Sequence, residues 1–401
     1  MKGLFRIASK EKRFKVLRFC LLLFVLGQFF GNAVLSFCYV FLVVGAIINI
    51  DSINKSDKRI IVGLVLFFAF FLINTFSSAI NSYEFIEFLK VEKLIAFLIF
   101  PVIFLISKNL FTQQNFINRL KLTYFIGGNL SLIILLVVAT VNSINNSSII
   151  YFTYNELTNP LGIQPIYYGA FYCLAIIFGF DLFAFFKKHQ RIIGFGTFLL
   201  TLGVILVASR ISWIILVIVL PIKLEPIFKE HKKVFFIALF SLFSFMLLVF
   251  NNPTIKNRLL LLNSNVSSYS GLAFRMKIWE NTFDLIYKKP ILGYGAYDAE
   301  LELQKKFSAE NFRRAYFLKL NAHNQYLQTF LESGVLGLFF LLLILLFFLY
   351  NTKADKNKLL FLILICLSLL TESYFRRFNG VLFFCYFYFF FLSIEIKKKT
   401  N

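Results

Sequence analysis

The chain contains the segment NAHNQYLQTFLESGVLGL at residues 321–338, which leads directly into the apolar run 339–350. This segment places a histidine, an asparagine and a carboxylate at the mouth of a hydrophobic helix. It also closes the long polar stretch 251–325, whereas most of the remaining sequence is hydrophobic. We therefore interpret the rest of the chain as a scaffold that holds this polar segment in place at the end of the helix.

The composition is typical of a membrane protein with many spans. Of the 401 residues, 59% are hydrophobic and 15% are charged, and the mean hydropathy is +0.76. A soluble domain averages about 45–50% apolar and about 25% charged residues. The repeated apolar runs are long enough to cross a bilayer and predict an all-α fold with about 12 transmembrane helices.

The net charge of +22 does not predict a nucleic-acid partner, because of where the charges lie. Most Lys and Arg are found in short segments between apolar runs. This is the distribution that the positive-inside rule describes, and the basic segment 1–15 therefore predicts a cytoplasmic N-terminus. Membrane lipids, rather than nucleic acid, are the expected surroundings of the chain.

The apolar run 192–220 is ambiguous, since it could form one steep helix or two short ones. A turn at Ser209-Arg210 places three basic segments on the cytoplasmic side, and without the turn all three would lie outside. These segments are 223–233, 353–358 and 397–399. Short loops govern topology, so the sequence predicts the turn, with Arg210 on the outer face.

This topology divides the chain into three parts. Residues 1–250 would form an N-terminal bundle of about nine spans, 251–325 a large periplasmic loop, and 326–401 the C-terminal spans with a cytoplasmic tail. The loop carries eleven Lys and Arg against six Asp and Glu, and this excess suggests an anionic partner. Alternatively, a long loop crosses the membrane whatever its charge.

Within the loop, residues 274–286 have the pattern of an amphipathic helix that carries Arg275 and Trp279. The helix is expected to end at the Pro/Gly turn KKPILGYG at residues 288–295. A helix with arginine and tryptophan could lie on lipid headgroups.

Arg210 is flanked by apolar runs, where an arginine at the helix centre costs ~2.5–3.5 kcal/mol on insertion scales. Its guanidinium could pair with a carboxylate or hold a phosphate in a bidentate fork. Alternatively, Arg210 reaches from a helix end to the membrane surface as a structural residue. The residues alone leave these alternatives open.

His323 is the histidine with a candidate chemical role, because His189 and His231 lie in basic linkers. A neutral imidazole at His323 could accept a proton from a hydroxyl, although a lone histidine at an interface is also often structural. Glu372 stands beside Arg376 and Arg377 and predicts a local ion-pair network, or else a partner that orients a basic site residue.

No metal or cofactor site is visible in the sequence. The five cysteines lie in apolar runs and are expected to be small buried side chains. The chain has no phosphate-binding Walker loop, no HExxH and no GxSxG. Asp181 lies inside an expected span without an obvious partner, and it is left without a role.

Three sequence features carry a family resemblance. They are Ser209-Arg210 between two spans, Arg275 and Trp279 followed by PILGYG at 290–295, and AHNQYL at 322–327 with ESGVLGL at 332–338. In their order and spacing these features resemble the O-antigen ligase/polymerase family of bacterial membrane glycosyltransferases. The likeness covers residues 196–391. One departure is Gln164 before Pro165, where relatives often carry a histidine.

The resemblance implies a GT-C-like enzyme of lipopolysaccharide biosynthesis in the bacterial inner membrane. Such an enzyme moves a glycan from undecaprenyl diphosphate to an acceptor hydroxyl, such as that of lipid A-core, at the periplasmic face. The resemblance also implies that Arg210 and Arg275 hold the diphosphate without a metal ion and that His323 is the base. The other residues expected at the substrate site are Asn324, Glu332, Trp279 and Glu372.

Other functions remain open at this point. An O-antigen polymerase would use a second lipid-linked glycan as acceptor, and a protein O-oligosaccharyltransferase would use a protein. A transporter of lipid-linked oligosaccharides belongs to another class. Transporters of that kind tend to show internal repeats and charges at mid-span. The absence of a visible repeat in the sequence favours an enzyme.

Overall fold

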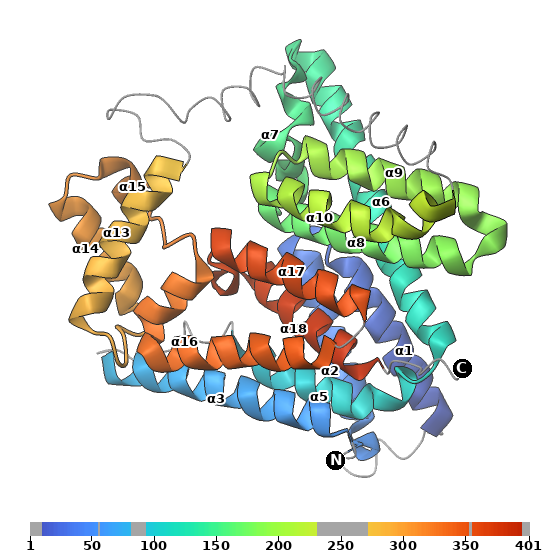
Figure 1. The fold of residues 1–401 in the computed structure, drawn as a ribbon, viewed down its shortest axis with the longest axis horizontal. Coiled ribbons are helices and arrows are strands. Elements are labelled where there is room, and N and C mark those ends of the chain that lie inside the picture. Colours follow the sequence, from blue (N-terminus) through green and yellow to red (C-terminus); the bar gives the residue numbers. More distant parts are fainter. Residues whose placement is uncertain (1–9, 55–56, 82–93, 231–271, 353–354, 395–401) are drawn as a thin grey trace. The chain divides into compact units, whose positions relative to one another are not determined.

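The structure is a computed structural model that describes residues 10–54, 57–81, 94–230, 272–352 and 355–394. Every regular element in these ranges is a helix (Figure 1). The helices fall into two compact units. The first unit comprises the described parts of Met1–Ser52, Asn109–Leu260 and Lys356–Ile365. The second comprises those of Ile53–Lys108, Leu261–Asp355 and Cys366–Asn401.

Six helical segments among the described residues are long and apolar enough to cross a membrane. They are α2 (Gly31–Ile48), α3 (Lys58–Asn81), α6 (Gln114–Asn146), α8 (Pro165–Phe185), the segment Lys187–Leu206 and α16 (Gln325–Thr352). Two shorter apolar helical segments are Ala96–Leu110 and Phe378–Ser393. An all-helical membrane protein is confirmed. The count of about 12 spans, the division into 1–250, 251–325 and 326–401, and the outer position of the long loop stay predictions.

The first unit is built around α8, most of which is buried. Its remaining helices are α1 (Lys10–Gly27), α2, α6, α7 (Tyr154–Thr158), α9 (Gln190–Leu206), α10 (Arg210–Glu230) and the first part of α17 (Lys356–Thr371). Three short 3-10 turns lie between consecutive helices of this unit: η5 (Ile149–Phe152), η6 (Asn159–Leu161) and η7 (Lys187–His189). Two others, η2 (Ile50–Ser52) after α2 and η4 (Lys108–Leu110) before α6, lie where the chain passes from one unit to the other. Gly169 lets α8 approach α10, because a Cβ there would lie 1.8 Å from Ser212 Oγ.

The predicted turn at Ser209-Arg210 is confirmed. α9 ends at Leu206 and α10 begins at Arg210, with Ala208 at φ +52° between them. The last carbonyls of a helix have no partner within it. Here Trp213 Nε1 lies 3.2 Å from Val204 O and 3.3 Å from Ile205 O, so the first turn of α10 satisfies the end of α9.

Asp181, for which the sequence showed no obvious partner, is paired in the structure. Its carboxylate on α8 pairs with Lys121 Nζ of α6 at 2.5 Å and with Lys223 Nζ of α10 at 2.7 Å. Asn357 of α17 donates a third hydrogen bond at 2.8 Å. These partners lie in other helices, and the local sequence around Asp181 therefore gave no sign of them.

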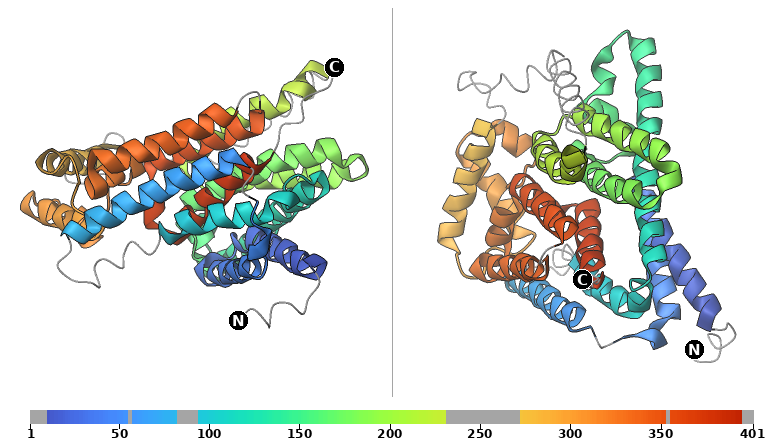
Figure 2. Two further views of the ribbon diagram at one scale, coloured as in Figure 1. Left: turned by 90° about the horizontal axis from the view of Figure 1, so that it is seen from below. Right: turned by 45° about the vertical axis from the view of Figure 1, so that its right-hand side comes forward.

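The second unit contains α3, α5 (Ala96–Ser107), α13 (Leu272–Lys288), α14 (Asp298–Ala309), α15 (Arg313–Phe317), α16, the end of α17, η8 (Tyr374–Arg376) and α18 (Phe378–Ser393). α3 and α16 lie side by side, as Figure 1 and both views of Figure 2 show. α5 and α18 pack with α3 through aromatic rings. The ring centroid of Phe67 on α3, for example, lies 4.9 Å from the ring centroid of Phe97 and 4.8 Å from that of Tyr388.

The amphipathic helix expected at 274–286 is present as α13, but its apolar side is covered by protein. Ile278 and Leu285 are buried in a small core with Leu303 and Phe307 of α14 and Leu331 of α16. Met276, Phe283 and Tyr287 on the same helix are exposed, and contact of α13 with lipid headgroups stays a prediction. The helix attaches the α13–α15 segment to the start of α16.

α16, the first of the spans expected within residues 326–401, is not continuous. It is broken at Ser333 (φ −129°) and Gly334 (φ +65°, ψ −164°). The carbonyls freed by the break accept hydrogen bonds from the loop after α13: Tyr294 N donates to Leu331 O at 2.9 Å and Gly295 N to Glu332 O at 2.7 Å. The segment PILGYG at 290–295 thus docks into the broken helix.

Candidate active site

The predicted site residue His323 lies immediately before the first turn of α16. Asn324 caps this turn: its Oδ1 accepts hydrogen bonds from Tyr326 N at 2.9 Å and Leu327 N at 3.2 Å. An asparagine side chain in this position satisfies the free N–H groups at a helix start. Asn324 is buried, so its visible role is to fix where the helix begins.

His323 has an uncommon backbone conformation. Its φ is +45°, a region that costs a residue with a Cβ about 1–3 kcal/mol. The His323 N–H donates to Asn321 Oδ1 at 2.9 Å, which helps to hold this conformation. The imidazole remains 25% exposed. Such strain is found most often where a side chain has to be held in one direction.

The imidazole is held by a buried carboxylate. His323 Nδ1 lies 3.1 Å from Glu372 Oε2, and the Glu372 side chain is 9% exposed. Burial acts to raise the pKa of Glu372. The hydrogen bond with His323, the charges of His323 and Arg275, and the Ser373 N–H outweigh it and hold the pKa below its usual value. Glu372 is therefore an ionised acceptor.

Glu372 does not form the expected network with its neighbouring arginines. Arg376 pairs instead with Glu300 of α14 and Glu332 of α16. The contact with His323 matches the other possibility, in which the carboxylate orients a basic site residue. Arg376 Nη1 also donates a hydrogen bond of 2.9 Å to Ala296 O, just before α14.

α13 brings two more predicted residues to this cluster. Arg275 and Trp279 are four residues apart and lie on the same side of the helix. Trp279 Nε1 donates to Ala322 O at 3.0 Å, directly before His323. Arg275 is half-buried, and its positive charge helps to lower the pKa of Glu372. One helix face thus carries a guanidinium and an indole to the histidine loop.

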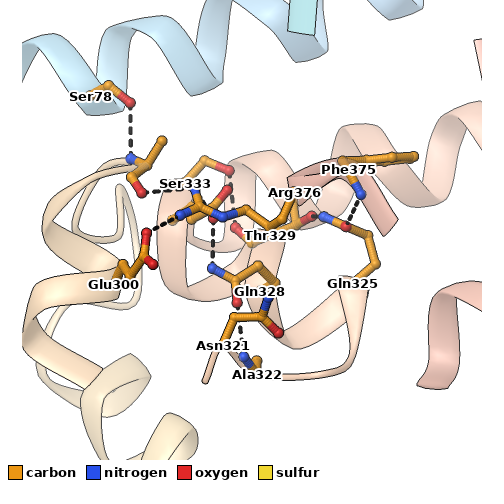
Figure 3. Close-up of polar contacts among 12 residues, drawn as sticks. Ser78, Glu300, Asn321, Ala322, Gln325, Gln328, Thr329, Ser333, Phe375 and Arg376 are labelled. Carbon is orange, nitrogen blue, oxygen red and sulfur yellow. Dashed lines mark hydrogen bonds and ion pairs between the residues drawn. The ribbon is translucent and has the colours of Figure 1, made fainter. Parts of the chain in front are cut away.

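Glu332, which was expected to bind substrate, is engaged within the protein. Its Oε1 accepts a hydrogen bond from Gln328 Nε2 at 2.6 Å and lies 3.2 Å from Arg376 Nη1. Figure 3 shows Arg376 between Glu300 and the start of α16, with Gln328 next to Ala322. Sequence reasoning missed Gln328 and Glu300. The available signal for Gln328 was its position four residues before Glu332 on the same helix face.

Arg210 belongs to the first unit, where it begins α10 with an exposed side chain. The cluster of His323, Glu372, Arg275 and Trp279 lies entirely within the second unit. The structure therefore brings four of the predicted site residues together, and the approach of Arg210 to them stays a prediction.

Comparison with known proteins supports the family resemblance. The family model described as O-antigen ligase matches residues 195–342, a range that includes Arg210, Arg275 and His323. A search of curated proteins found no match. Glu372 lies beyond the matched range, so its contact with His323 comes from the fold alone. Residues 195–342 of the chain are therefore similar to the O-antigen ligase family.

Proposed function

We propose that the chain is an O-antigen ligase-type glycosyltransferase. It moves a glycan from undecaprenyl diphosphate to an acceptor hydroxyl of lipid A-core, at the periplasmic face of the bacterial inner membrane. The observation that carries the proposal is the 3.1 Å contact between His323 Nδ1 and the buried Glu372, next to a family-model match that includes His323. The apolar helices and the match to this family together support lipids and glycans as partners in general terms.

In this proposal His323 is the general base. A carboxylate can only accept hydrogen bonds, so ionised Glu372 keeps the imidazole proton on Nδ1 and leaves the lone pair on Nε2. Nε2 has no hydrogen-bond partner among the described residues, and the ring is 25% exposed. Nε2 takes the proton of the acceptor hydroxyl as its oxygen attacks the anomeric carbon. Such a base contributes about 10²–10⁴-fold in rate.

The leaving group is undecaprenyl diphosphate, which carries away the electrons of the broken bond between the anomeric carbon and oxygen. Fixed positive charge stabilises the charge that develops on it. Arg275 is the guanidinium near the histidine, and Arg210 is its proposed partner on the same diphosphate. A guanidinium offers two parallel N–H donors to a phosphate, and in this proposal no metal ion is needed for that role.

The test is transfer by purified protein in liposomes that contain labelled undecaprenyl-diphosphate-linked glycan. Lipid A-core, a second lipid-linked glycan and an acceptor protein are supplied separately. We expect labelled lipid A-core together with released undecaprenyl diphosphate. Elongated lipid-linked glycan would instead indicate a polymerase, and labelled protein an oligosaccharyltransferase. Glycan that crosses the bilayer without covalent transfer would indicate a transporter and contradict the proposal.

The role of Arg275 can be tested in the same assay. Arg275→Lys keeps the charge but loses the two-donor geometry, so we expect a slower transfer at saturating acceptor. Arg377→Lys is the matched control, because Arg377 is exposed and lies outside the cluster. Equal rates for the two variants would remove Arg275 from the diphosphate site.

A further inference from the structure

We propose that Gln328, Glu332 and Arg376 form a positioning relay that fixes the backbone at Ala322 and thereby aims the imidazole of His323. This assigns Glu332 to positioning rather than to substrate binding. The catalytic meaning of the relay rests on the proposed function of His323. Its effect on the loop does not, and can be measured separately.

The peptide groups of Ala322 are held on both sides. Ala322 N–H donates to Gln328 Oε1 at 3.0 Å, and Ala322 O accepts from Trp279 Nε1 at 3.0 Å. Ala322 is fully buried, so its N–H depends on this one side chain rather than on water. The residue that follows is His323, whose φ of +45° needs support from its surroundings.

The direction of the Gln328 amide is dictated by Glu332. A carboxylate cannot donate, so the amide NH₂ must face Glu332 Oε1 at 2.6 Å. The amide oxygen is then left to face the Ala322 N–H, which can only donate. Both side chains are buried, Gln328 to 1% and Glu332 to 7% exposure. Glu332 therefore sets the orientation of the group that holds the histidine loop.

Arg376 fixes Glu332 in turn. Its Nη1 lies 3.2 Å from Glu332 Oε1 and donates to Ala296 O at 2.9 Å, while Nη2 pairs with Glu300 Oε2 at 2.5 Å. The guanidinium is thus anchored to α14 as well as to α16, as Figure 3 shows. The relay connects α14, η8 and the start of α16 to the backbone beside His323.

Breaking the relay should let the loop relax and turn the imidazole away from Glu372. A misplacement of about 1 Å at a reacting group costs about 10²-fold in rate. We therefore expect Gln328→Met, which has a similar length but no hydrogen bonds, to lower kcat by about 10²-fold with the KM for the donor unchanged. The glutamine in Glu332→Gln still offers an oxygen to Gln328, so the fall in kcat should be smaller for this variant than for Gln328→Met.

The matched control is Gln304→Met. Gln304 Nε2 also donates to a carbonyl of the same loop, Leu320 O at 2.9 Å, but Gln304 is outside the relay. Hydrogen–deuterium exchange of the full-length protein in lipid nanodiscs should show faster exchange at the Ala322 amide in Gln328→Met. The Gln304→Met variant should keep the wild-type rate at that amide.

A second readout is a double mutant. A positioning residue acts through His323, so Gln328→Met should cause no further loss of rate in the His323→Ala background. A further loss there would mean a general structural defect and would overturn the relay. So would unchanged exchange at Ala322, or a raised KM with unchanged kcat. If the wild-type protein transfers glycan to no acceptor, the proposed function fails while the exchange result still decides the relay.

Discussion

At the scale of the residue, Glu372 is a buried carboxylate that the fold keeps ionised. Burial acts to raise its pKa, but the hydrogen bond with His323 and the positive charge of Arg275 help to hold the pKa below the usual value of 4.5. A buried carboxylate without such partners would be neutral at ordinary pH. Glu372 therefore depends on these contacts to remain ionised.

Glu372 should make the stability of the protein depend on pH. Its folded-state pKa is lowered, so it stabilises the fold fully above about pH 4.5, and this stabilisation is lost as the pH falls through the lowered pKa. In the Glu372→Gln variant the side chain at this position has no ionisable group. The melting temperature of this variant in detergent should fall less steeply than that of the wild type on acidification below about pH 4.5. Parallel curves for the two proteins would contradict the lowered pKa.

Some of the site could be predicted from single residues, and some could not. His323 stood out because the chain has only three histidines, and Arg275 because it lies in a motif that carries the family resemblance. Gln328 and Arg376 did not, because their roles come from contacts with segments that are distant in the sequence. For Glu372 the sequence left two alternatives open, an ion-pair network with the adjacent arginines or the orientation of a basic site residue, and it did not show that the histidine loop approaches this carboxylate.

At the scale of the element, the break in α16 decides how the loop after α13 is held. The turn between α9 and α10 could be predicted, because an arginine and the charge of later loops both favoured it. The break at Ser333 and Gly334 could not, because small residues are common in continuous membrane helices. The break depends on backbone hydrogen bonds to residues 290–295, and a sequence pattern does not show which loop will dock.

Gly334→Ala should destabilise the protein more than the same substitution at a glycine that has positive φ but open space around it. A Cβ at Gly334 would lie 2.0 Å from Ile291 O, at φ +65°. We expect a loss of about 1–2 kcal/mol from the backbone and a further ~1–3 kcal/mol from the clash. Gly162→Ala is the matched control, with φ +67° and nothing within 4 Å. Thermal unfolding that ranks the two variants equally would contradict docking of the loop.

At the scale of the whole molecule, each unit contains a cluster of ions that joins its helices. In the first unit Asp181 meets Lys121 and Lys223. In the second, Asp57 meets Lys108 at 2.5 Å, and Lys108 also donates to Ser393 O. Lysines from the basic linkers thus have structural partners. Their charge pattern led to a prediction of topology, but it gave no sign of these contacts, since the partners come from other helices.

Asp181→Ala should destabilise the protein by about 3 kcal/mol, because it leaves the charges of Lys121 and Lys223 mostly buried and uncompensated. Breaking a buried ion pair costs about 3–5 kcal/mol, and we expect the lower end of this range because the Asp181 side chain is 21% exposed. Glu225→Ala is the control, because its pair with Lys356 is exposed and should change stability by less than about 1 kcal/mol. Equal melting temperatures for both variants would contradict the structural role of Asp181.

The most direct test of the proposed chemistry is the rate at which His323→Ala transfers glycan in liposomes, with saturating lipid-linked donor and acceptor. We predict a fall of about 10²–10⁴-fold relative to the wild type, in protein that stays folded in the membrane. His189→Ala, which changes an exposed histidine in η7, should keep the wild-type rate. Transfer by His323→Ala at the wild-type rate would contradict the assignment of His323 as the base.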